Sequence, residues 1–351
     1  MTRFIVAPLI IFLSCFARAA EAPVMATIDS SLTSAAPQIK MFAFDGDANS
    51  YFLSSQNASA ADHFTLVFDA PVALKSVSVL TGRVKGGDAL DAGVLELSED
   101  GKTYVEAAKF SDGSVKFEAQ EKKVRAVRVK PTEDLKHPLA IREFTLVSTP
   151  EVKVFKYPVE VITDTKDAPE MTEWIEKTAK VCERAYQMIC EELKSDGFTP
   201  LTVVKMTLKN DYKGVAATGG NQITGAVKYF KSHQDDVGAM VHEMVHAAQQ
   251  YQSRRNPSWL VEGVADYIRN YKYEPEKKMR PVNPDAVKYD GSYQISARFL
   301  KFLTDTYDPD IVKKLNRIMR EGKYNEGVFE ELTKKKLPEL DAEWKAELRK
   351  K

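Results

Sequence analysis

The sequence lacks several features that would point to a common class of partner. Its 50 Lys and Arg residues are matched by 50 Asp and Glu residues, so no bulk charge favours nucleic acid or an anionic membrane. No apolar run beyond the first twenty residues is long enough to cross a bilayer as a helix. Histidine is also scarce, with five residues in the chain. A partner must therefore be recognised by local sites.

Cysteine is equally rare, with three residues in the chain, and Cys182 and Cys190 share one segment with helical periodicity. On a helix that rises about 1.5 Å per residue, their Cα atoms would lie about 12 Å apart. A disulfide cannot span that distance. We therefore expect two free thiols on a buried helix face.

What the sequence does contain is typical of a folded, soluble protein. Hydrophobic residues make up 44% and charged residues 28% of the 351 residues. This length is too great for one ordinary core and suits two domains.

The first twenty residues differ from all that follow. Arg3 precedes an apolar run from Phe4 to Phe16, and small residues then follow in Ala17-Arg18-Ala19-Ala20. This pattern predicts a secretory signal peptide over residues 1–20, and hence a secreted or periplasmic protein. Two alternatives remain open. The run could be a membrane anchor, or Cys15 could carry a lipid that anchors the protein.

Residues 26–150 predict an all-β sandwich. Short runs of alternating apolar and polar residues recur there, separated by turn signals such as Asp45-Gly46, Gly86-Gly87 and Asp112-Gly113. Several short strands at near-regular spacing are typical of a sandwich. The clearest strand patterns cover residues 65–68, 76–80, 93–97 and 124–129.

Residues 151–351 predict a second domain of the α+β class. The pattern changes at Thr149-Pro150, after which a few strands are followed by a run of helices. Strands are expected at residues 154–162, 201–208 and 222–230. Amphipathic helices are expected at residues 171–193, 236–252, 259–271, 293–306, 309–320 and 326–334.

The chemistry is carried by His242-Glu243-Met244-Val245-His246, inside the helix expected from residue 236. Residues i and i+4 share a helix face, so both imidazoles can bind one metal ion. Glu243 is too close in sequence to be a comfortable third ligand, but it can take a proton from water at the metal. Two ordinary surface histidines are the simpler alternative. Apolar neighbours argue against it, because buried imidazoles need a metal or polar partners.

A catalytic zinc ion needs three protein ligands and one open position. Glu262, in the helix that follows, lies among apolar neighbours, where an unpaired carboxylate is costly. We therefore expect Glu262 to be the third ligand. Asp266 lies one turn later on the same face and can accept a hydrogen bond from a zinc-binding histidine. Both residues could instead be plain helix carboxylates.

Three motifs together resemble the basic secretory protein family of metallopeptidases: residues 241–246, 259–267 and 293–300. The resemblance covers residues 152–337 and implies a zincin-like fold. The family is similar to gluzincins, which implies Glu262 as the ligand that completes the zinc site. It also implies an edge strand that aligns peptide substrate, for which residues 219–230 are the candidate. Tyr293 is our candidate for stabilising the oxyanion, with a packed core aromatic as the alternative.

The first domain resembles discoidin (F5/8 type C) sandwiches, which include many carbohydrate-binding modules. The resemblance rests on residues 44–54 and 140–146. It implies a calcium site at Asp47, Ser50 and Glu143, and oxygen ligands in a turn suit that ion. A loop held by hydrogen bonds alone is the alternative. Sugar binding is open, because the domain contains no Trp; a spacer or adhesion role suits the sequence equally well.

Three functions therefore compete. The first is a zinc peptidase that hydrolyses peptide bonds with Glu243 as general base. The second is an extracellular binding or adhesion protein without turnover. The third is a glycopeptidase that the sandwich directs to glycosylated proteins, an idea that rests on fold analogy alone. The intact set of site residues favours the peptidase.

Overall fold

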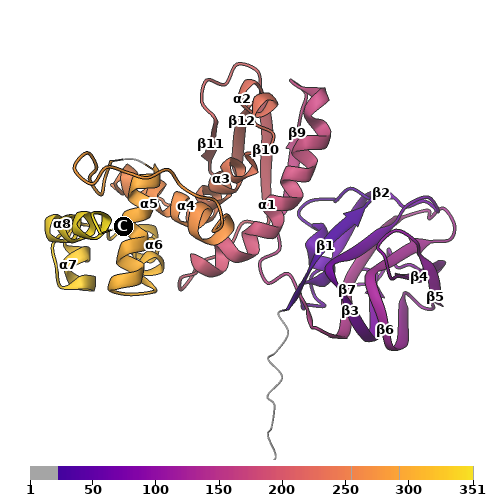
Figure 1. Ribbon diagram of the computed structural model, residues 1–351. Coiled ribbons are helices and arrows are strands. Elements are labelled where there is room, and N and C mark those ends of the chain that lie inside the picture. Colours follow the sequence, from indigo (N-terminus) through magenta and orange to yellow (C-terminus); the bar gives the residue numbers. More distant parts are fainter. Residues whose placement is uncertain (1–22, 254, 292, 351) are drawn as a thin grey trace, which may run out of the picture.

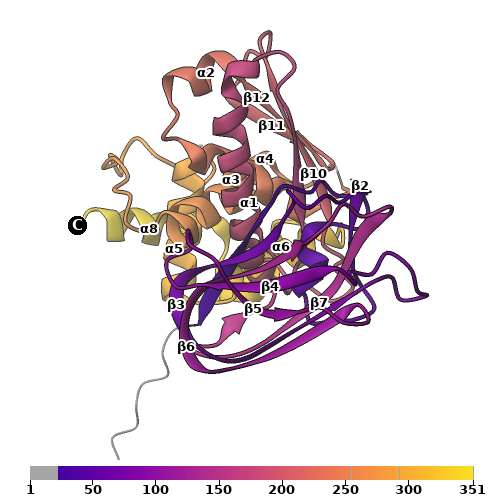
Figure 2. The same ribbon diagram turned by 90° about the vertical axis from the view of Figure 1, so that its right-hand side faces the viewer.

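The computed structural model describes residues 23–253, 255–291 and 293–350. It divides into a part built of strands, formed by the N-terminal residues, and a mixed helical part that follows (Figure 1). Figure 2 shows the strand-built part in front of the helical part. The predicted signal peptide and Cys15 lie outside the described residues. Within the described residues, no helix is both long enough and apolar enough to span a membrane.

The N-terminal part is an all-β sandwich, as predicted. Strands β3 and β6 are each 18 residues long, and their register shifts between Val67 and Val72 of β3 and again between Leu74 and Ser76. Before the first shift β3 pairs with β1, and after it β3 pairs with β7, so these long strands contribute to both layers. The strands are β1 (Val24–Ser30), β2 (Phe52–Asn57), β3 (Phe64–Thr81), β4 (Gly93–Ser98), β5 (Val105–Lys109), β6 (Ser114–Pro131) and β7 (Pro138–Thr149).

Aromatic side chains fill the space between the layers. Phe64 is fully buried, and its ring centroid lies 5.0 Å from that of Phe52 and 5.9 Å from that of Phe144. Alternate residues of β3 point inward, because successive side chains of a strand face opposite sides of a sheet. The core is therefore assembled from the alternation seen in the sequence.

The C-terminal part contains a four-stranded sheet with the order β11-β12-β10-β9. Strands β9, β10 and β12 are parallel, and the edge strand β11 runs antiparallel to β12. Helices α1 and α3 pack together beside this sheet. The elements are β8 (Val152–Lys153), β9 (Glu160–Asp164), α1 (Thr172–Glu192), β10 (Val203–Lys209), β11 (Ala216–Gly219), β12 (Gln222–Ala226), α2 (Val227–Ser232), α3 (Val237–Gln249), α4 (Ser258–Ile268), α5 (Tyr293–Thr306), α6 (Ile311–Arg320), α7 (Gly327–Thr333) and α8 (Leu337–Leu348).

Two predicted strands are wrong in extent. Of the strand expected at residues 154–162, only residues 160–162 are in a strand, β9; Phe155 is instead buried beside Phe44 of the sandwich, with ring centroids 5.8 Å apart. The strand expected at residues 222–230 ends at Ala226 and continues as α2. Val227 and Phe230 are buried at helical spacing, so the same apolar pattern serves a helix.

Helix α8 is an addition to the predicted elements, and it buries Leu337, Leu340 and Trp344. The other predicted helices are present, with shifted ends. The cysteines behave as expected, because Cys182 and Cys190 are both free and buried in α1.

Side chains of the sandwich and of the helical part meet at Glu160 of β9, which is 9% exposed. Its carboxylate accepts hydrogen bonds from the Ser34 hydroxyl at 2.5 Å and the Lys40 ammonium at 2.6 Å. Strand β1 of the sandwich also pairs with β8, at Val24 and Val152. The first strand of the sandwich is therefore held by residues that follow its last strand.

Helix α5 packs closely on α4 at a glycine. A Cβ atom added to Gly263 would lie 2.8 Å from the Cβ atom of Ser296. Real Cβ atoms do not approach that closely, and Ser296 has no flexible end that could give way. Gly263 therefore sets how closely α5 approaches the helix that carries Glu262.

We predict that Gly263→Ala destabilises the protein by about 1–3 kcal/mol, because it overpacks this contact. Urea unfolding measures the change. Ser296→Gly provides the test of cause, since it removes the opposing side chain. The cost of Gly263→Ala should be smaller in the Ser296→Gly background, and additive costs would contradict the proposed clash.

Candidate metal centre

The site is built on α3, which begins at Val237 and ends where Gln250 adopts a left-handed conformation with φ of 49°. Apart from the polar residues of the site, the buried residues of this helix are small or apolar. The helix lies against α1, the sheet and α4. The one-turn spacing of His242 and His246 therefore directs both imidazoles toward α4, which carries Glu262.

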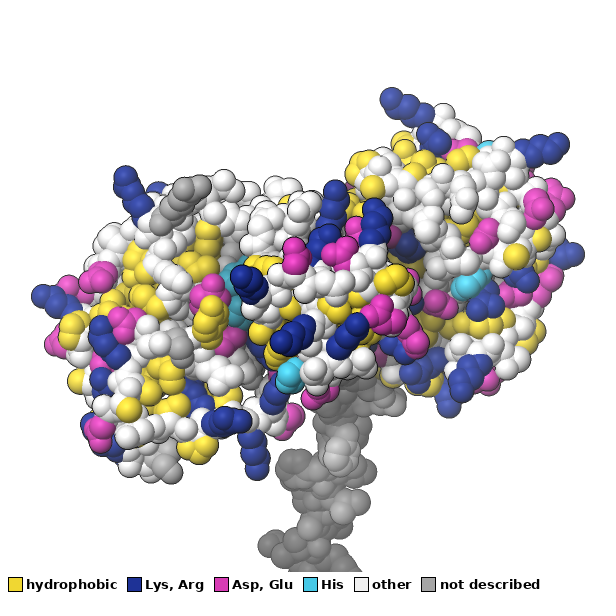
Figure 3. All heavy atoms as spheres, turned by 90° about the horizontal axis from the view of Figure 1, so that it is seen from above, with side chains coloured by type: hydrophobic (Ala, Val, Ile, Leu, Met, Phe, Trp, Pro, Cys, Tyr) yellow, Lys and Arg dark blue, Asp and Glu magenta, His cyan; other side chains and the backbone are white. Residues whose placement is uncertain are grey.

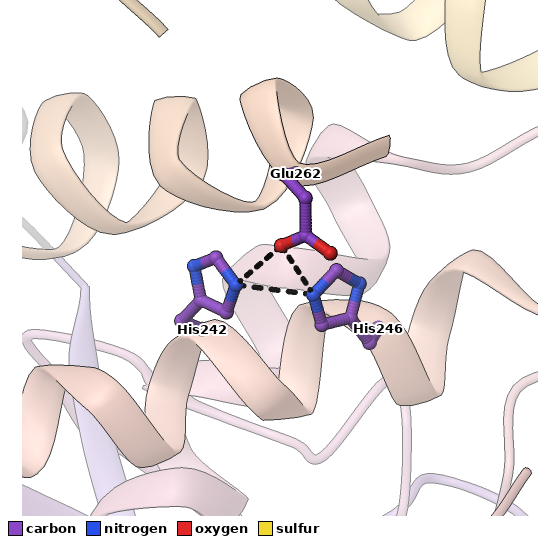
Figure 4. Close-up of side chains that lie close together, drawn as sticks. All are labelled: His242, His246 and Glu262. Atoms are coloured by element: carbon purple, nitrogen blue, oxygen red, sulfur yellow. Dashed lines mark hydrogen bonds and ion pairs between the residues drawn. The ribbon is translucent and has the colours of Figure 1, made fainter. Parts of the chain in front are cut away.

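Three side-chain atoms converge between α3 and α4 (Figure 4). The Nε2 atoms of His242 and His246 are 3.0 Å apart. The Glu262 Oε2 atom lies 3.1 Å from the first nitrogen and 3.2 Å from the second. Within the described part of the chain, these three residues are the group of His, Cys, Asp and Glu side chains that could hold a metal ion.

The outer nitrogens of both imidazoles are bound to acceptors. His242 Nδ1 lies 2.7 Å from Asp266 Oδ1, and His246 Nδ1 lies 2.8 Å from Gln249 Oε1. The Gln249 amide is oriented by its own donation to the Val261 carbonyl oxygen at 2.9 Å. Each Nδ1 therefore donates its hydrogen outward, and each Nε2 faces Glu262, where it offers a lone pair to a metal ion once its own proton is lost.

This donor set fits a zinc ion. Two imidazole nitrogens and one carboxylate oxygen form a known catalytic zinc set that leaves one position open. Ligand atoms bound tetrahedrally at about 2.0–2.1 Å lie about 3.3 Å apart. The three observed separations, from 3.0 to 3.2 Å, are close to that value.

Electrostatics also favour a cation here. Burial lowers the pKa of His242, but hydrogen bonds with Asp266 and Glu262 and the nearby carboxylate charges raise it to about 9. Burial raises the pKa of Glu262, but its contacts with both imidazoles lower it to about 2. A proton on His242 therefore supplies positive charge at the point where a metal ion would do so.

Glu243 lies beside these ligands and is buried, with 7% of its surface exposed. The Thr218 hydroxyl lies 2.7 Å from Glu243 Oε2 and 3.0 Å from the Glu243 carbonyl oxygen. Thr218 belongs to β11, so the edge strand is tied to the helix of the metal site. Sequence analysis missed this residue, because no motif connects it with residues 242–246.

The structure corrects the candidate for the edge strand. Residues 219–230, proposed for substrate alignment, contain β12 and α2. Strand β12 is flanked by β11 and β10, so its backbone groups are already paired. The edge strand beside α3 is β11, at Ala216–Gly219, and β9 forms the opposite edge. A hairpin with two short strands explains the error, since either strand could have been the outer one.

Tyr293 stands at the start of α5 and is 54% exposed. Its ring centroid lies 6.0 Å from that of His242. The negative charge of Glu262 raises the pKa of its phenol, and burial adds to the effect. The alternative, a packed core aromatic, does not describe this side chain.

The site opens into a cleft of about 1380 Å³. Histidine side chains are visible in the hollow of the helical part in Figure 3. The cleft is lined by β11, α3, α4 and the start of α5, which contribute Thr218, His242, Glu243, His246, Glu262, Asp266 and Tyr293. The cleft therefore collects the predicted site residues of this part of the chain.

The predicted calcium residues lie elsewhere, in the sandwich. Ser50 donates its hydroxyl hydrogen to the Asp45 carboxylate at 2.8 Å, and Glu143 Oε2 accepts from the Gly46 amide at 3.1 Å. Burial raises the pKa of Glu143 to about 8, helped by the charges of Asp45 and Asp47. Calcium at Asp47, Ser50 and Glu143 stays a prediction.

Comparison with known proteins identifies the C-terminal part. Residues 160–344 match the family BSP, described as "Peptidase of plants and bacteria". The match covers more than half of the 351 residues. The chain therefore belongs to this family of peptidases, which confirms the predicted family. A comparison with curated proteins finds no match.

Solved structures similar to this chain match its N-terminal part. A CBM32 domain of a family 31 glycoside hydrolase from Clostridium perfringens is 19% identical, with a TM-score of 0.30, over 34% of this chain and 92% of that one. The family 32 CBM of C. perfringens NanJ, in complex with galactose, is 14% identical, with a TM-score of 0.28, over 35% and 98%. A fucose-binding module from Streptococcus pneumoniae is 12% identical, with a TM-score of 0.30, over 35% and 93%.

We predict that zinc affinity depends on pH through His242. Since the pKa of this imidazole is about 9 in the metal-free protein, zinc must displace its proton at neutral pH. The apparent affinity should therefore rise about tenfold per pH unit between about pH 6.5 and 8.5. The proton stabilises the metal-free fold below about pH 6.5, and this contribution is lost as the pH rises through about 9. Titration against a competing chelator measures the affinity.

Asp266→Asn removes the carboxylate that holds His242. We expect about 10- to 100-fold weaker zinc binding at pH 8.5 and a smaller pH dependence. Asp305→Asn is the matched control, because Asp305 pairs with Lys301 on the outer surface of α5. An unchanged pH dependence in Asp266→Asn would contradict the assignment.

Proposed function

We propose that this member of the peptidase family is a zinc-dependent peptidase with His242, His246 and Glu262 as its metal ligands. The observation that carries the proposal is the convergence of two Nε2 atoms and one carboxylate oxygen within 3.2 Å of one another. Both imidazoles are also locked by acceptors on their far sides. Such a preorganised donor set supports metal binding more strongly than the sequence motif alone.

A zinc ion bound there would act as a Lewis acid on the substrate carbonyl and on water. Glu243 takes the proton from the attacking water and delivers it to the leaving amine. The Thr218 hydroxyl holds one oxygen of that carboxylate. In the described part of the chain, no hydrogen bond occupies the other oxygen; because Glu243 lines the cleft, this oxygen is the one proposed to accept the proton.

Two further elements of the cleft act on the substrate. Strand β11 has a free edge, so an extended peptide can pair with Ala216–Gly219 through backbone hydrogen bonds. Tyr293 presents an exposed phenol near His242 and can donate a hydrogen bond to the developing oxyanion. The substrate is therefore a protein or peptide bound in an extended conformation across the metal site.

We further propose that the protein acts outside the cytoplasm, on the basis of the signal-peptide pattern of residues 1–20. Lipid attachment at Cys15 remains the alternative. Glycan binding, adhesion and a glycopeptidase activity also stay predictions. In the sandwich, the exposed large hydrophobic side chains of the described residues are Val84, Val105 and Val147, none of them aromatic. We therefore favour the peptidase without assigning a sugar site.

Glu243→Gln tests the peptidase. The amide cannot accept the proton of water, so kcat/KM on a mixed peptide library should fall by about 10²- to 10⁴-fold. Zinc content, measured by elemental analysis, should stay at about one ion per chain, because Glu243 is not a ligand in this assignment. Glu173→Gln, on the exposed side of α1, is the control. Equal cleavage by wild type and Glu243→Gln removes Glu243 from the mechanism.

Thr218→Val tests the contact between the edge strand and the base. The substitution keeps the branched shape and removes the hydroxyl that holds Glu243. We expect kcat to fall about tenfold with little change in KM or zinc content, because a charge-assisted hydrogen bond is lost. Thr218→Ser should restore most of the activity. An equal loss in the Val and Ser variants would assign the effect to packing.

A further inference from the structure

The cleft contains one cation whose charge is not balanced nearby. Two arginines line it, Arg269 and Arg298. Arg269 is paired, since its guanidinium contacts Asp236 and lies 3.6 Å from Glu274. Among the described residues, Arg298 has no carboxylate partner; its one hydrogen bond goes from Nη2 to the Arg280 carbonyl oxygen at 2.5 Å.

The guanidinium of Arg298 is partly withdrawn from water. Its Nε atom is buried and has no acceptor among the described residues. Tyr271, in the turn of π-helix at Arg269–Tyr273 that follows α4, interacts electrostatically with Arg298; burial raises the pKa of Tyr271 to about 12, and the charge of Arg298 opposes that rise. Tyr271 is therefore a neutral phenol at neutral pH and does not balance the charge of Arg298.

Most of the hydrogen-bond donors of the Arg298 guanidinium have no acceptor among the described residues. Arginine carries five N–H donors in a planar fork that matches a carboxylate with two parallel hydrogen bonds. The buried Nε is out of reach of a ligand in the cleft, but among the described residues the Nη1 hydrogens and the second Nη2 hydrogen also have no acceptor, and these can bind a carboxylate. The metal site itself cannot supply it, because Glu262 and Asp266 are committed to the imidazoles.

We propose that Arg298 forms a subsite of the cleft that binds a carboxylate group of the peptide substrate. The inference rests on the proposed peptidase function and adds a substrate class to it. Arg298 and Tyr293 both belong to α5 and both line the cleft, so the subsite lies on the same wall as the proposed oxyanion donor. The carboxylate belongs either to an Asp or Glu side chain near the scissile bond or to the C-terminus of the peptide.

A purely structural role is the competing explanation. In that case Arg298 would serve only to hold the segment before α5 through the Arg280 carbonyl oxygen. That contact uses one of five donors and leaves Nε without a partner. The two explanations differ in their consequence for substrates, because only a subsite makes binding depend on a negative charge in the peptide.

The test measures peptide binding to zinc-loaded Glu243→Gln protein, which should hold peptides without cutting them. One arm compares peptides blocked at both ends that carry Glu or Gln at each position in turn. The other arm compares a free C-terminal carboxylate with a C-terminal amide. We expect one arm to show about 10- to 100-fold tighter binding of the charged peptide, and the responding arm identifies the source of the carboxylate.

Arg298→Met should abolish this difference, leaving charged and neutral peptides within about twofold of each other. Arg298→Lys should keep part of it, because the charge stays while the fork is lost. Arg317→Met, on the exposed face of α6, is the control. Thermal melting monitors the fold of each variant. Three outcomes would each overturn the proposal. The Glu243→Gln protein with Arg298 unchanged could bind charged and neutral peptides equally in both arms, or could show no measurable binding of charged peptides. The third is a preference for charged peptides that survives in Arg298→Met.

The outcome is separable from that of the peptidase proposal. If zinc-loaded wild-type protein cuts no peptide while its Glu243→Gln variant binds charged peptides selectively, the peptidase fails and the subsite stands. If wild-type protein cuts peptides but neither arm shows a preference, the peptidase stands and the subsite fails.

Discussion

The candidate site depends on the packing of α3 against α4. This contact brings together two imidazoles and two carboxylates; His242 and Asp266 are buried, while the side chains of His246 and Glu262 are 15% and 25% exposed. Burying these groups separately would be costly, so they stabilise one another through short contacts of 2.7 to 3.2 Å. The positive charge at the centre of this arrangement is carried by the proton on His242, whose pKa is raised to about 9. The surrounding carboxylates stabilise that charge.

Much of this site could be predicted from the sequence, because the proposed ligands are spaced one helical turn apart. His242 and His246 are one turn apart, and Glu262 and Asp266 are one turn apart on the next helix. Two facing helices can therefore be expected to bring all four together. Gln249 and Thr218 could not be predicted in this way. The first needs the orientation of its amide, and the second comes from a strand whose position depends on sheet order.

The fold was predictable to a similar degree, and for the same reason. Alternating patterns gave the sandwich, and amphipathic patterns gave α1, α3, α4, α5 and α6. Errors fell where one pattern suits two structures, as at Val227 and Phe230, whose spacing fits the end of a strand or a short helix. The junction at Phe155 was also unpredictable, because its burial against Phe44 is a contact between residues far apart in sequence.

Two glycines allow close packing around the elements that carry the site. A Cβ atom at Gly225 of β12 would lie 2.4 Å from Met240 Cε of α3, and one at Gly263 of α4 would lie 2.8 Å from Ser296 Cβ of α5. The first makes room for the Met240 side chain between α3 and β12, and the neighbouring β11 carries the Thr218 that contacts Glu243. The second allows α5 to approach α4, and the ring centroid of Tyr293 at the start of α5 lies 6.0 Å from that of His242. The two walls come from different parts of the chain: β11 carries Thr218, and α5 carries Tyr293 and Arg298, which are proposed to contact the substrate. In the proposed mechanism, a change of specificity on α5 therefore leaves the contact between Thr218 and Glu243 in place.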